Sequence, residues 1–331
     1  MIPLEQIDLS DETFSVNFIP DFTKLRSSIE AVGLIQPVLL RKKPSGYQII
    51  CGFRRISIFH ELRMSEIESR VFGEKETDQS NLFSISLHEN LSTRGFNAVE
   101  IAIALEKLDH PFQIDRAVVV KTFLPLFSLE PNEKILNTYL SLAQMEDEVK
   151  TFVLKEEVSR SNIRRLAALN PHDRIAILSL VSPLKLSESR LREILILLEE
   201  ISRRNQCPER DIVQRSEIQA ILSQKELTSS QKAERVKKIL MDLRYPRMRG
   251  MEEKFEEKKR EFNLPSNISL HHPTFFEGKG LRVEFQFETI EEYRSILSSL
   301  SQLGNKAEFR EMLKNKHQIT STNNQTNSNG Q

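Results

Sequence analysis

Cysteine is scarce in this sequence, and long hydrophobic runs are absent. Its two cysteines, Cys51 and Cys207, form neither a disulfide framework nor a metal-binding pattern. No apolar run approaches the ~20 residues needed to cross a bilayer, and the first residues lack the basic and then apolar pattern of a signal segment. These absences predict a protein of the reducing cytoplasm with no membrane partner.

Net charge is also absent, because 47 basic residues balance 47 acidic ones. The molecule as a whole therefore has no bulk attraction to nucleic acid. Any DNA binding must come from a local basic surface.

The length and composition are those of a globular protein. A chain of 331 residues can form two or three domains, each with its own core. A hydrophobic content of 39% with 28% charged residues is ordinary for a soluble protein.

Three short motifs lie at predicted junctions between strands and helices, at residues 33–38, 51–55 and 89–94. In the second motif an apolar strand, Gln48 to Cys51, stops at Gly52 and is followed by a predicted amphipathic helix. The free N–H groups of such a helix start form an anion site, and glycine allows close approach of the backbone. Arg54 and Arg55 oppose the helix dipole there, which indicates a polyanionic ligand. The alternative is that both arginines are merely solvated.

The third motif places Glu89 beside Asn90 at the end of a helix that Asp78 is expected to cap. Carboxylate and amide oxygens suit Mg²⁺, which commonly shares its ligands with nucleotide phosphates. The alternative is a helix C-cap beside a solvated glutamate.

Taken in order, the three motifs resemble those of the ParB family of chromosome and plasmid partition proteins. That family carries Gly-x-x-Gln-Pro, Gly-Glu-Arg-Arg and Glu-Asn-x-x-Arg in similar spacing, and residues Asn97 and Glu100 to Ala102 extend the likeness. Phe53 replaces the family's glutamate, and Thr93 stands where its third-motif arginine would be, with Arg94 one position later.

The resemblance implies an α+β, ParB/sulfiredoxin-like N-terminal domain that binds CTP with Mg²⁺ and often hydrolyses it. It assigns Glu89 and Asn90 to Mg²⁺ and to tentative catalytic roles. The nucleotide-binding residues that it implies are Gln36, Gly52, Arg54, Arg55, Glu89, Asn90 and Arg94.

The chain becomes almost entirely helical after Asn97. Two helices are predicted here, one over residues 113–124 and one that Pro131 opens at its first position. The pair fits a helix-turn-helix, and it stands at the place in the chain where ParB proteins carry theirs. An ordinary helical hairpin is the alternative, because the connection is long and the second helix starts with acidic residues. A later helix places Arg160 and Arg164 on one face, with Ser159 as its cap. The DNA-binding candidates are Lys134, Asn137, Arg160, Arg164 and Arg165.

The sequence predicts five segments. Residues 1–96 form the nucleotide-binding domain, and residues 97–186 form a helical domain with the helix-turn-helix. Residues 187–262 are a helical connector with a hinge at 244–250, residues 263–316 a small α/β unit, and residues 317–331 a disordered tail. The small unit can bury little surface alone, so it is expected to mediate dimerisation.

Several functions fit this organisation. The leading hypothesis is a dimeric, CTP-controlled clamp on double-stranded DNA in chromosome or plasmid partition, or a nucleoid-occlusion-like protein, located on the nucleoid and served by a ParA-type ATPase. A ParB-fold transcriptional regulator without hydrolysis is the alternative, and a ParB-fold nuclease or kinase is a minor one. A sulfiredoxin is rejected, because Phe53 occupies the position where its cysteine would be.

Overall fold

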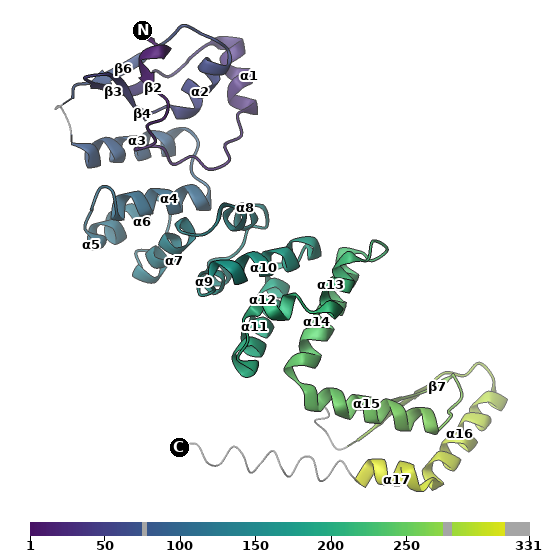
Figure 1. Cartoon of the computed structure of the whole chain (residues 1–331). Coiled ribbons are helices and arrows are strands. Elements are labelled where there is room, and N and C mark those ends of the chain that lie inside the picture. The colour runs from purple at the N-terminus through teal and green to yellow at the C-terminus, as the bar shows by residue number, and fades with distance from the viewer. Residues whose placement is uncertain (75–77, 274–279, 315–331) are drawn as a thin grey trace, which may run out of the picture. The chain divides into compact units, whose positions relative to one another are not determined.

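The computed structural model describes residues 1–74, 78–273 and 280–314 (Figure 1). The chain forms two compact units, one of residues 1–202 and 206–233 and the other of residues 203–205 and 234–331. The predicted boundaries at 96, 186, 262 and 316 divide the chain more finely and remain predictions. The predicted tail, residues 317–331, lies outside the described residues. No described helix is both long and apolar enough to span a membrane.

The N-terminal part is built on a four-stranded mixed sheet in the order β2-β4-β3-β6. Strands β3 and β4 form an antiparallel hairpin, whereas β2 pairs parallel with β4 and β6 pairs parallel with β3. The four strands are β2 Ile7–Asp8, β3 Val38–Lys43, β4 Gly46–Cys51 and β6 Ser69–Phe72.

The alternating apolar residues from Ile2 to Leu9 predict a single edge strand, and this prediction is wrong for a continuous element. A 3-10 turn, Leu4–Gln6, buries Leu4 and splits the segment into β1, Ile2–Pro3, and β2. The two halves then pair with different partners, since β1 lies antiparallel to β5, Glu66–Ile67.

Three helices accompany the sheet: α1 Thr23–Val32, α2 Phe53–Glu61 and α3 Gln79–Thr93. Buried residues of α1 and α2, such as Ile29 and Ile56, pack with Val38 and Leu40 of β3. In Figure 1, α3 runs below the sheet, and it contacts β4. The side chain of Asp78 caps α3 by accepting from the N–H of Asn81, which confirms the predicted cap.

The helical part of the first unit begins with a capping box, in which Asn97 and Glu100 satisfy each other's N–H groups. Helix α4 packs on α7. The predicted helix over 113–124 is present from Arg116 to Leu126, with a π-helical stretch, Val119–Phe123, between α5 and α6. The further helices are α4 Ala98–Asp109, α5 Arg116–Val118, α6 Leu124–Leu126, α7 Glu133–Ala143, α8 Asp147–Lys155, α9 Arg160–Ala167, α10 Pro171–Val181, α11 Glu188–Asn205, α12 Glu209–Val213, α13 Ser216–Ser223 and α14 Ser229–Arg244. The last residues of α11 and most of α14 belong to the second unit.

The sequence predicted that Pro131 opens α7, but the helix begins two residues later, at Glu133. Asn132 is the N-cap, and its side chain accepts from the N–H of Lys134. An asparagine side chain can satisfy a free N–H group at a helix start, whereas proline cannot, so the cap decides where the helix begins.

The second unit contains α15 Pro246–Glu261, β7 Ile268–His271, β8 Arg282–Phe285, α16 Ile290–Asn305 and α17 Ala307–Lys314. Its small core includes Phe255, Phe262, Leu270 and Leu303. Within the predicted hinge at 244–250 the structure breaks the helix only at Tyr245, because Pro246 occupies the first turn of α15 and residues 247–250 continue that helix. Proline is tolerated at this position, where the N–H group that it lacks would have no helical partner.

Candidate nucleotide site and nucleic-acid surface

The three sequence motifs meet at one cavity of about 430 Å³ in the N-terminal part of the first unit. All seven residues predicted to bind nucleotide line it: Gln36, Gly52, Arg54, Arg55, Glu89, Asn90 and Arg94. A strand end, a helix start and a helix end thus converge, as the positions of the motifs in the sequence predicted. The volume falls in the range of small-molecule sites.

Gly52 joins β4 to α2 at the wall of this cavity. Its φ of 101° lies in the left-handed region. A Cβ atom at this position would stand 2.6 Å from Cγ1 of Val38, so both the backbone and the space require glycine. No side chain caps α2, which leaves its first N–H groups available to an anion.

Arg55 is held across the cavity by the third motif. Its Nη2 donates to Glu89 Oε1 at 2.6 Å, and its Nη1 donates to the carbonyl oxygen of Gln36 at 2.8 Å. One guanidinium therefore links all three motifs. The pair is largely buried, with 13% and 19% of the two side chains exposed, so solvent screens it poorly.

Cys51 lies behind this pair as the last residue of β4. Its thiol donates to Glu89 Oε2 at 2.6 Å, and its sulfur accepts from Asn90 Nδ2 at 3.2 Å. Burial, followed by the bond to Glu89, raises the pKa of the Cys51 thiol to about 12. The thiol is therefore protonated at neutral pH and is no nucleophile.

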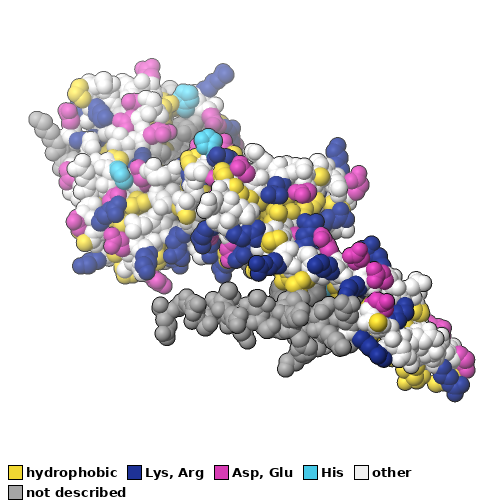
Figure 2. All heavy atoms as spheres, turned by 60° about the horizontal axis from the view of Figure 1, so that its bottom comes forward, with side chains coloured by type: hydrophobic (Ala, Val, Ile, Leu, Met, Phe, Trp, Pro, Cys, Tyr) yellow, Lys and Arg dark blue, Asp and Glu magenta, His cyan; other side chains and the backbone are white. Residues whose placement is uncertain are grey.

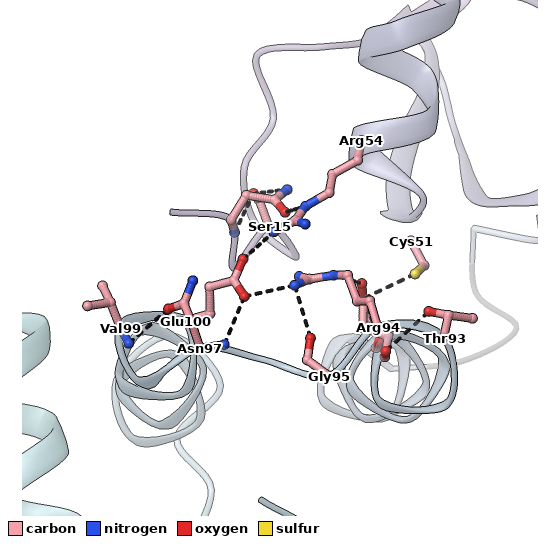
Figure 3. A network of polar contacts seen from close by, with 12 residues as sticks. Ser15, Cys51, Arg54, Thr93, Arg94, Gly95, Asn97, Val99 and Glu100 are labelled. Carbon is pink, nitrogen blue, oxygen red and sulfur yellow. Dashed lines mark hydrogen bonds and ion pairs between the residues drawn. The ribbon is translucent and has the colours of Figure 1, made fainter. Parts of the chain in front are cut away.

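A second network centres on Glu100 of α4, which Arg94 links to Asn90 and which Arg54 links to α2 (Figure 3). Arg94 Nε donates to Asn90 Oδ1 at 3.0 Å, and Arg94 Nη1 donates to Glu100 Oε2 at 2.8 Å. The other oxygen of Glu100 accepts from Arg54 Nη2 at 2.6 Å. The arginine displaced by one position in the third motif thus still reaches the cavity.

A magnesium ion would find few protein ligands here. Among the described residues, no group of three or more His, Cys, Asp and Glu side chains could hold a metal. Both oxygens of Glu89 and the amide oxygen of Asn90 already accept hydrogen bonds from Arg55, Cys51 and Arg94. The donor set therefore suits an ion that is held mainly by nucleotide phosphates and only in part by protein.

The motifs did not reveal the loop before α1, which also lines the cavity. This loop contributes Phe14, Val16, Asn17 and Asp21. Asn17 Oδ1 accepts from Arg54 Nε at 2.8 Å. The loop has no helical or strand periodicity, and its contact with Arg54 joins residues 37 positions apart. No local sequence pattern therefore indicated these residues.

Comparison with known proteins agrees with this geometry. The family model of the ParB N-terminal domain matches residues 2–91. This chain carries a ParB N-terminal domain. The matched segment contains all three motifs up to Leu91, whereas Arg94 and Glu100 lie just beyond it.

Curated relatives extend the likeness past this domain. A protein named "Probable chromosome-partitioning protein ParB" from Vibrio cholerae is 24% identical over 172 residues, 52% of this chain and 56% of its own length. Nucleoid occlusion proteins from Lysinibacillus sphaericus and Listeria monocytogenes are 29% and 26% identical over 149 and 198 residues, covering 44% and 58% of this chain. The matches span 46% and 66% of those two proteins' lengths. The chain thus covers about half to two thirds of these relatives.

Solved structures of ParB from Caulobacter crescentus, truncated at the C-terminus, are also similar. The ParB chain in the complex with CTP-gamma-S is 22% identical to this chain. The match covers 54% of this chain and 94% of the ParB chain, with a TM-score of 0.25. The ParB chain in the complex with the centromeric parS site is 18% identical. That match covers 59% of this chain and 97% of the ParB chain, with a TM-score of 0.36. Such low TM-scores do not show a shared arrangement of the whole chains.

The predicted DNA-binding residues lie outside the ParB N-terminal domain, on α7 and α9. Arg160 and Arg164 are exposed on α9, and Lys134 and Asn137 are exposed on α7, which packs against α9. Arg165 differs, because it is partly buried and its Nη1 donates to Glu199 Oε2 at 2.8 Å. The structure therefore leaves Arg160 and Arg164 with the greater freedom to meet a ligand.

Charged side chains from neighbouring helices hold both ends of α9. Glu188 accepts from the N–H of Ser159 at 3.2 Å and from Asn162 Nδ2 at 2.8 Å, so a carboxylate occupies the N-terminal end. At the other end, Arg174 Nη1 donates to the carbonyl of Leu169 at 2.7 Å while its Nε bonds Glu146. Both charges complement the helix dipole. A phosphate would therefore bind the arginines of α9 and not its N-terminus.

The remaining surface carries both signs of charge. On the face shown in Figure 2, several Lys and Arg side chains gather near the middle of the view, and Asp and Glu side chains lie among and around them. This distribution matches the zero net charge, and it confines electrostatic attraction for DNA to local groups.

Proposed function

We propose that this chain is a DNA-binding protein of chromosome or plasmid partition in which CTP controls a clamp on double-stranded DNA. One observation carries the proposal: a single cavity in a ParB N-terminal domain brings all three motifs together and gathers an uncapped helix start with three arginines, two from the second motif and one from the third. Backbone N–H groups and guanidinium groups are the donors that phosphate oxygens require.

Different residues of the cavity would bind different parts of a nucleotide and its metal ion. The first N–H groups of α2 would hold phosphate oxygens, and Arg55 would add two parallel hydrogen bonds. Glu89 and Asn90 would hold Mg²⁺, which offsets phosphate charge when it is bound. For Glu89 to do so, its oxygens must at least share their present partners, Arg55 and Cys51.

The DNA part of the proposal rests on α9. Arg160 and Arg164 are exposed on one face and four residues apart, and would contact phosphates of one strand. Lys134 and Asn137 are exposed on the packed helix α7 and would also contact the DNA. Arg165 would support α9 through Glu199.

The second unit is proposed to join two copies of the chain. Strand β8 pairs with β7 alone among the described strands, which leaves its other edge open. Val283, Phe287, Ile290 and Leu297 are exposed apolar side chains on or near β8 and α16. An open edge beside apolar side chains suits pairing with an identical unit. A ParA-type ATPase as a further partner, and a location on the nucleoid, follow from the family resemblance.

A nucleotide panel tests the proposal. Isothermal titration of the full chain with CTP, ATP, GTP and UTP, in the presence of Mg²⁺ and with or without DNA, should show binding selective for CTP. A parallel assay of phosphate release measures hydrolysis. Equal affinity for all four nucleotides, or no binding to any of them, would contradict the proposal.

A transcriptional regulator without hydrolysis is the second candidate, and one observation favours it. Glu89, the only carboxylate of the third motif, is fully engaged by Arg55 and Cys51. CTP binding without phosphate release would support this alternative. The nuclease and kinase hypotheses gain nothing from the described residues, which lack a cluster of metal-binding side chains.

A further inference from the structure

Glu100 is a buried carboxylate that the proposed nucleotide site does not use. It lies in the first turn of α4, only 1% exposed, and it does not line the cavity. Figure 3 shows it between Arg54 and Arg94, with one carboxylate oxygen directed at each guanidinium. Both arginines line the cavity, so this one carboxylate pairs with two of its three arginines.

A phosphate in the cavity would compete with this carboxylate for the same guanidinium groups. The two negative charges would repel each other across a few ångströms, with little solvent to screen them. Three arginines line the cavity, but Glu89 pairs with one of them and Glu100 with the other two. These two carboxylates thus already offset two of the three positive charges that the arginines offer to an anion.

Both arginines have anchors other than Glu100. Arg54 Nε donates to Asn17 Oδ1 at 2.8 Å, and Arg94 Nε donates to Asn90 Oδ1 at 3.0 Å. The Arg94 guanidinium also stacks 4.9 Å from the ring centroid of Phe96. These contacts are to neutral groups, so they hold the arginines in place without offsetting their charge.

We propose that Glu100 is an internal competing anion, which a phosphate ligand must displace from Arg54 and Arg94. Glu100 thereby sets the affinity of the cavity for phosphates. Since its Oε2 also accepts from the N–H of Asn97 at 3.2 Å, displacement opens the capping box at the start of α4. The inference rests on the proposed function in that it concerns the same cavity, but it holds for any polyphosphate.

The test compares Glu100→Gln with the full-length wild type. Glutamine keeps the shape and can still close a capping box, but it removes the competing charge. Glu100→Gln should bind both CTP and inorganic triphosphate about tenfold more tightly, which corresponds to ~1.4 kcal/mol. Glu106→Gln removes one charge from the same helix at an intermediate-exposure position and should leave both affinities unchanged.

A purely structural role for Glu100 makes the opposite prediction, namely weaker binding together with a lower melting temperature. Unchanged or weaker binding by a folded Glu100→Gln variant would overturn the inference even where the wild type selects CTP. Tighter triphosphate binding without CTP selectivity would retain the inference and contradict the proposed function. Absence of binding by all three proteins would contradict both.

A measurement on the wild type covers the case in which the variant does not fold. Saturating triphosphate should speed hydrogen exchange of the amides at residues 97–101, because the capping box opens as Glu100 leaves the arginines. Glu106→Gln should respond like the wild type. Slower or unchanged exchange in that segment, with binding confirmed by titration, would show that Glu100 stays in place.

Discussion

The guanidinium of Arg55 donates to the carboxylate of Glu89 at 2.6 Å, and this ion pair joins the second motif to the third. The same guanidinium reaches the first motif through the carbonyl of Gln36. Arg55 thus both organises the cavity and offers it a positive charge. Any anion that binds Arg55 must share it with Glu89.

Replacement of Arg55 should abolish nucleotide binding. Arg55→Ala removes the fork that can bond two phosphate oxygens, and it leaves Glu89 as an unpaired charge facing the ligand. We expect CTP affinity to fall at least ~100-fold, which corresponds to about 2.7 kcal/mol. Arg55→Lys is the matched control: it keeps the charge but not the fork, so its affinity should fall between the two. Titration calorimetry measures all three proteins. Alanine and wild type binding alike would exclude Arg55 from the site.

Gly52→Ala should destabilise the N-terminal part. The new Cβ would stand 2.6 and 2.9 Å from two atoms of Val38, and alanine would be held at a φ of 101°. The expected loss is about 1–3 kcal/mol in the free energy of unfolding. In the double variant Gly52→Ala/Val38→Ala the 2.6 Å contact with Cγ1 is removed and only the 2.9 Å contact with Cβ remains, so the cost of Gly52→Ala should be smaller in the Val38→Ala background than in the wild type. Denaturant titration of the four proteins gives the coupling, and strict additivity would show that no collision occurs.

The thiol of Cys51 should resist alkylation until the protein unfolds. Its pKa is raised to about 12, so the native-state stabilisation is complete below the ordinary pKa of 9.0 and is lost as pH rises towards 12. Mass spectrometry after iodoacetamide treatment at about pH 8 should find Cys51 unmodified in the native protein and modified in denaturant. The partly exposed Cys207 serves as the internal reference. Rapid labelling of native Cys51 would contradict its burial and its bond to Glu89.

Arg160 and Arg164 should contribute non-specifically to DNA affinity. Replacing both by alanine should weaken binding to all sequences alike and reduce the slope of log affinity against log salt by up to about 2, because each lost phosphate contact reduces counterion release. The control Lys24→Ala/Lys225→Ala removes two exposed charges elsewhere on the first unit. Fluorescence anisotropy at several salt concentrations measures the slopes. Equal slopes in both variants would remove α9 from the interface.

Self-association should depend on the apolar surface near β8. Ile290 is 56% exposed, so Ile290→Glu can add a charge there with little effect on the fold of a single copy. If this surface joins two copies, the variant should be monomeric in sedimentation experiments at concentrations where the wild type dimerises. Val118→Glu, at a 45% exposed site of the first unit, should dimerise normally. A dimeric Ile290→Glu protein would place the contact elsewhere.

The sequence by itself determined where the motifs stand and how the local elements start. Caps such as Asp78 and Ser159 bond N–H groups three residues further on, so the local pattern suffices to predict them. The strand, Gly52 and helix junction is equally local. The same reasoning failed at residues 2–9 and, within the predicted hinge, at residues 246–250. Apolar alternation and a Pro-Gly composition were the only signals there, and neither specifies the turn that Leu4 makes or the helix that Pro246 starts.

Only the tertiary structure decided which charged side chains pair with one another at the cavity. Arg54 and Glu100 are 46 positions apart, and Arg55 and Glu89 are 34 apart, so their pairing depends on how α2, α3 and α4 pack. Periodicity specifies which face of a helix is buried, but not which carboxylate will neutralise which arginine. The sequence therefore predicted an anion site from its arginines. Packing placed Glu89 and Glu100 against them, because a buried charge is stable only beside a partner of opposite sign.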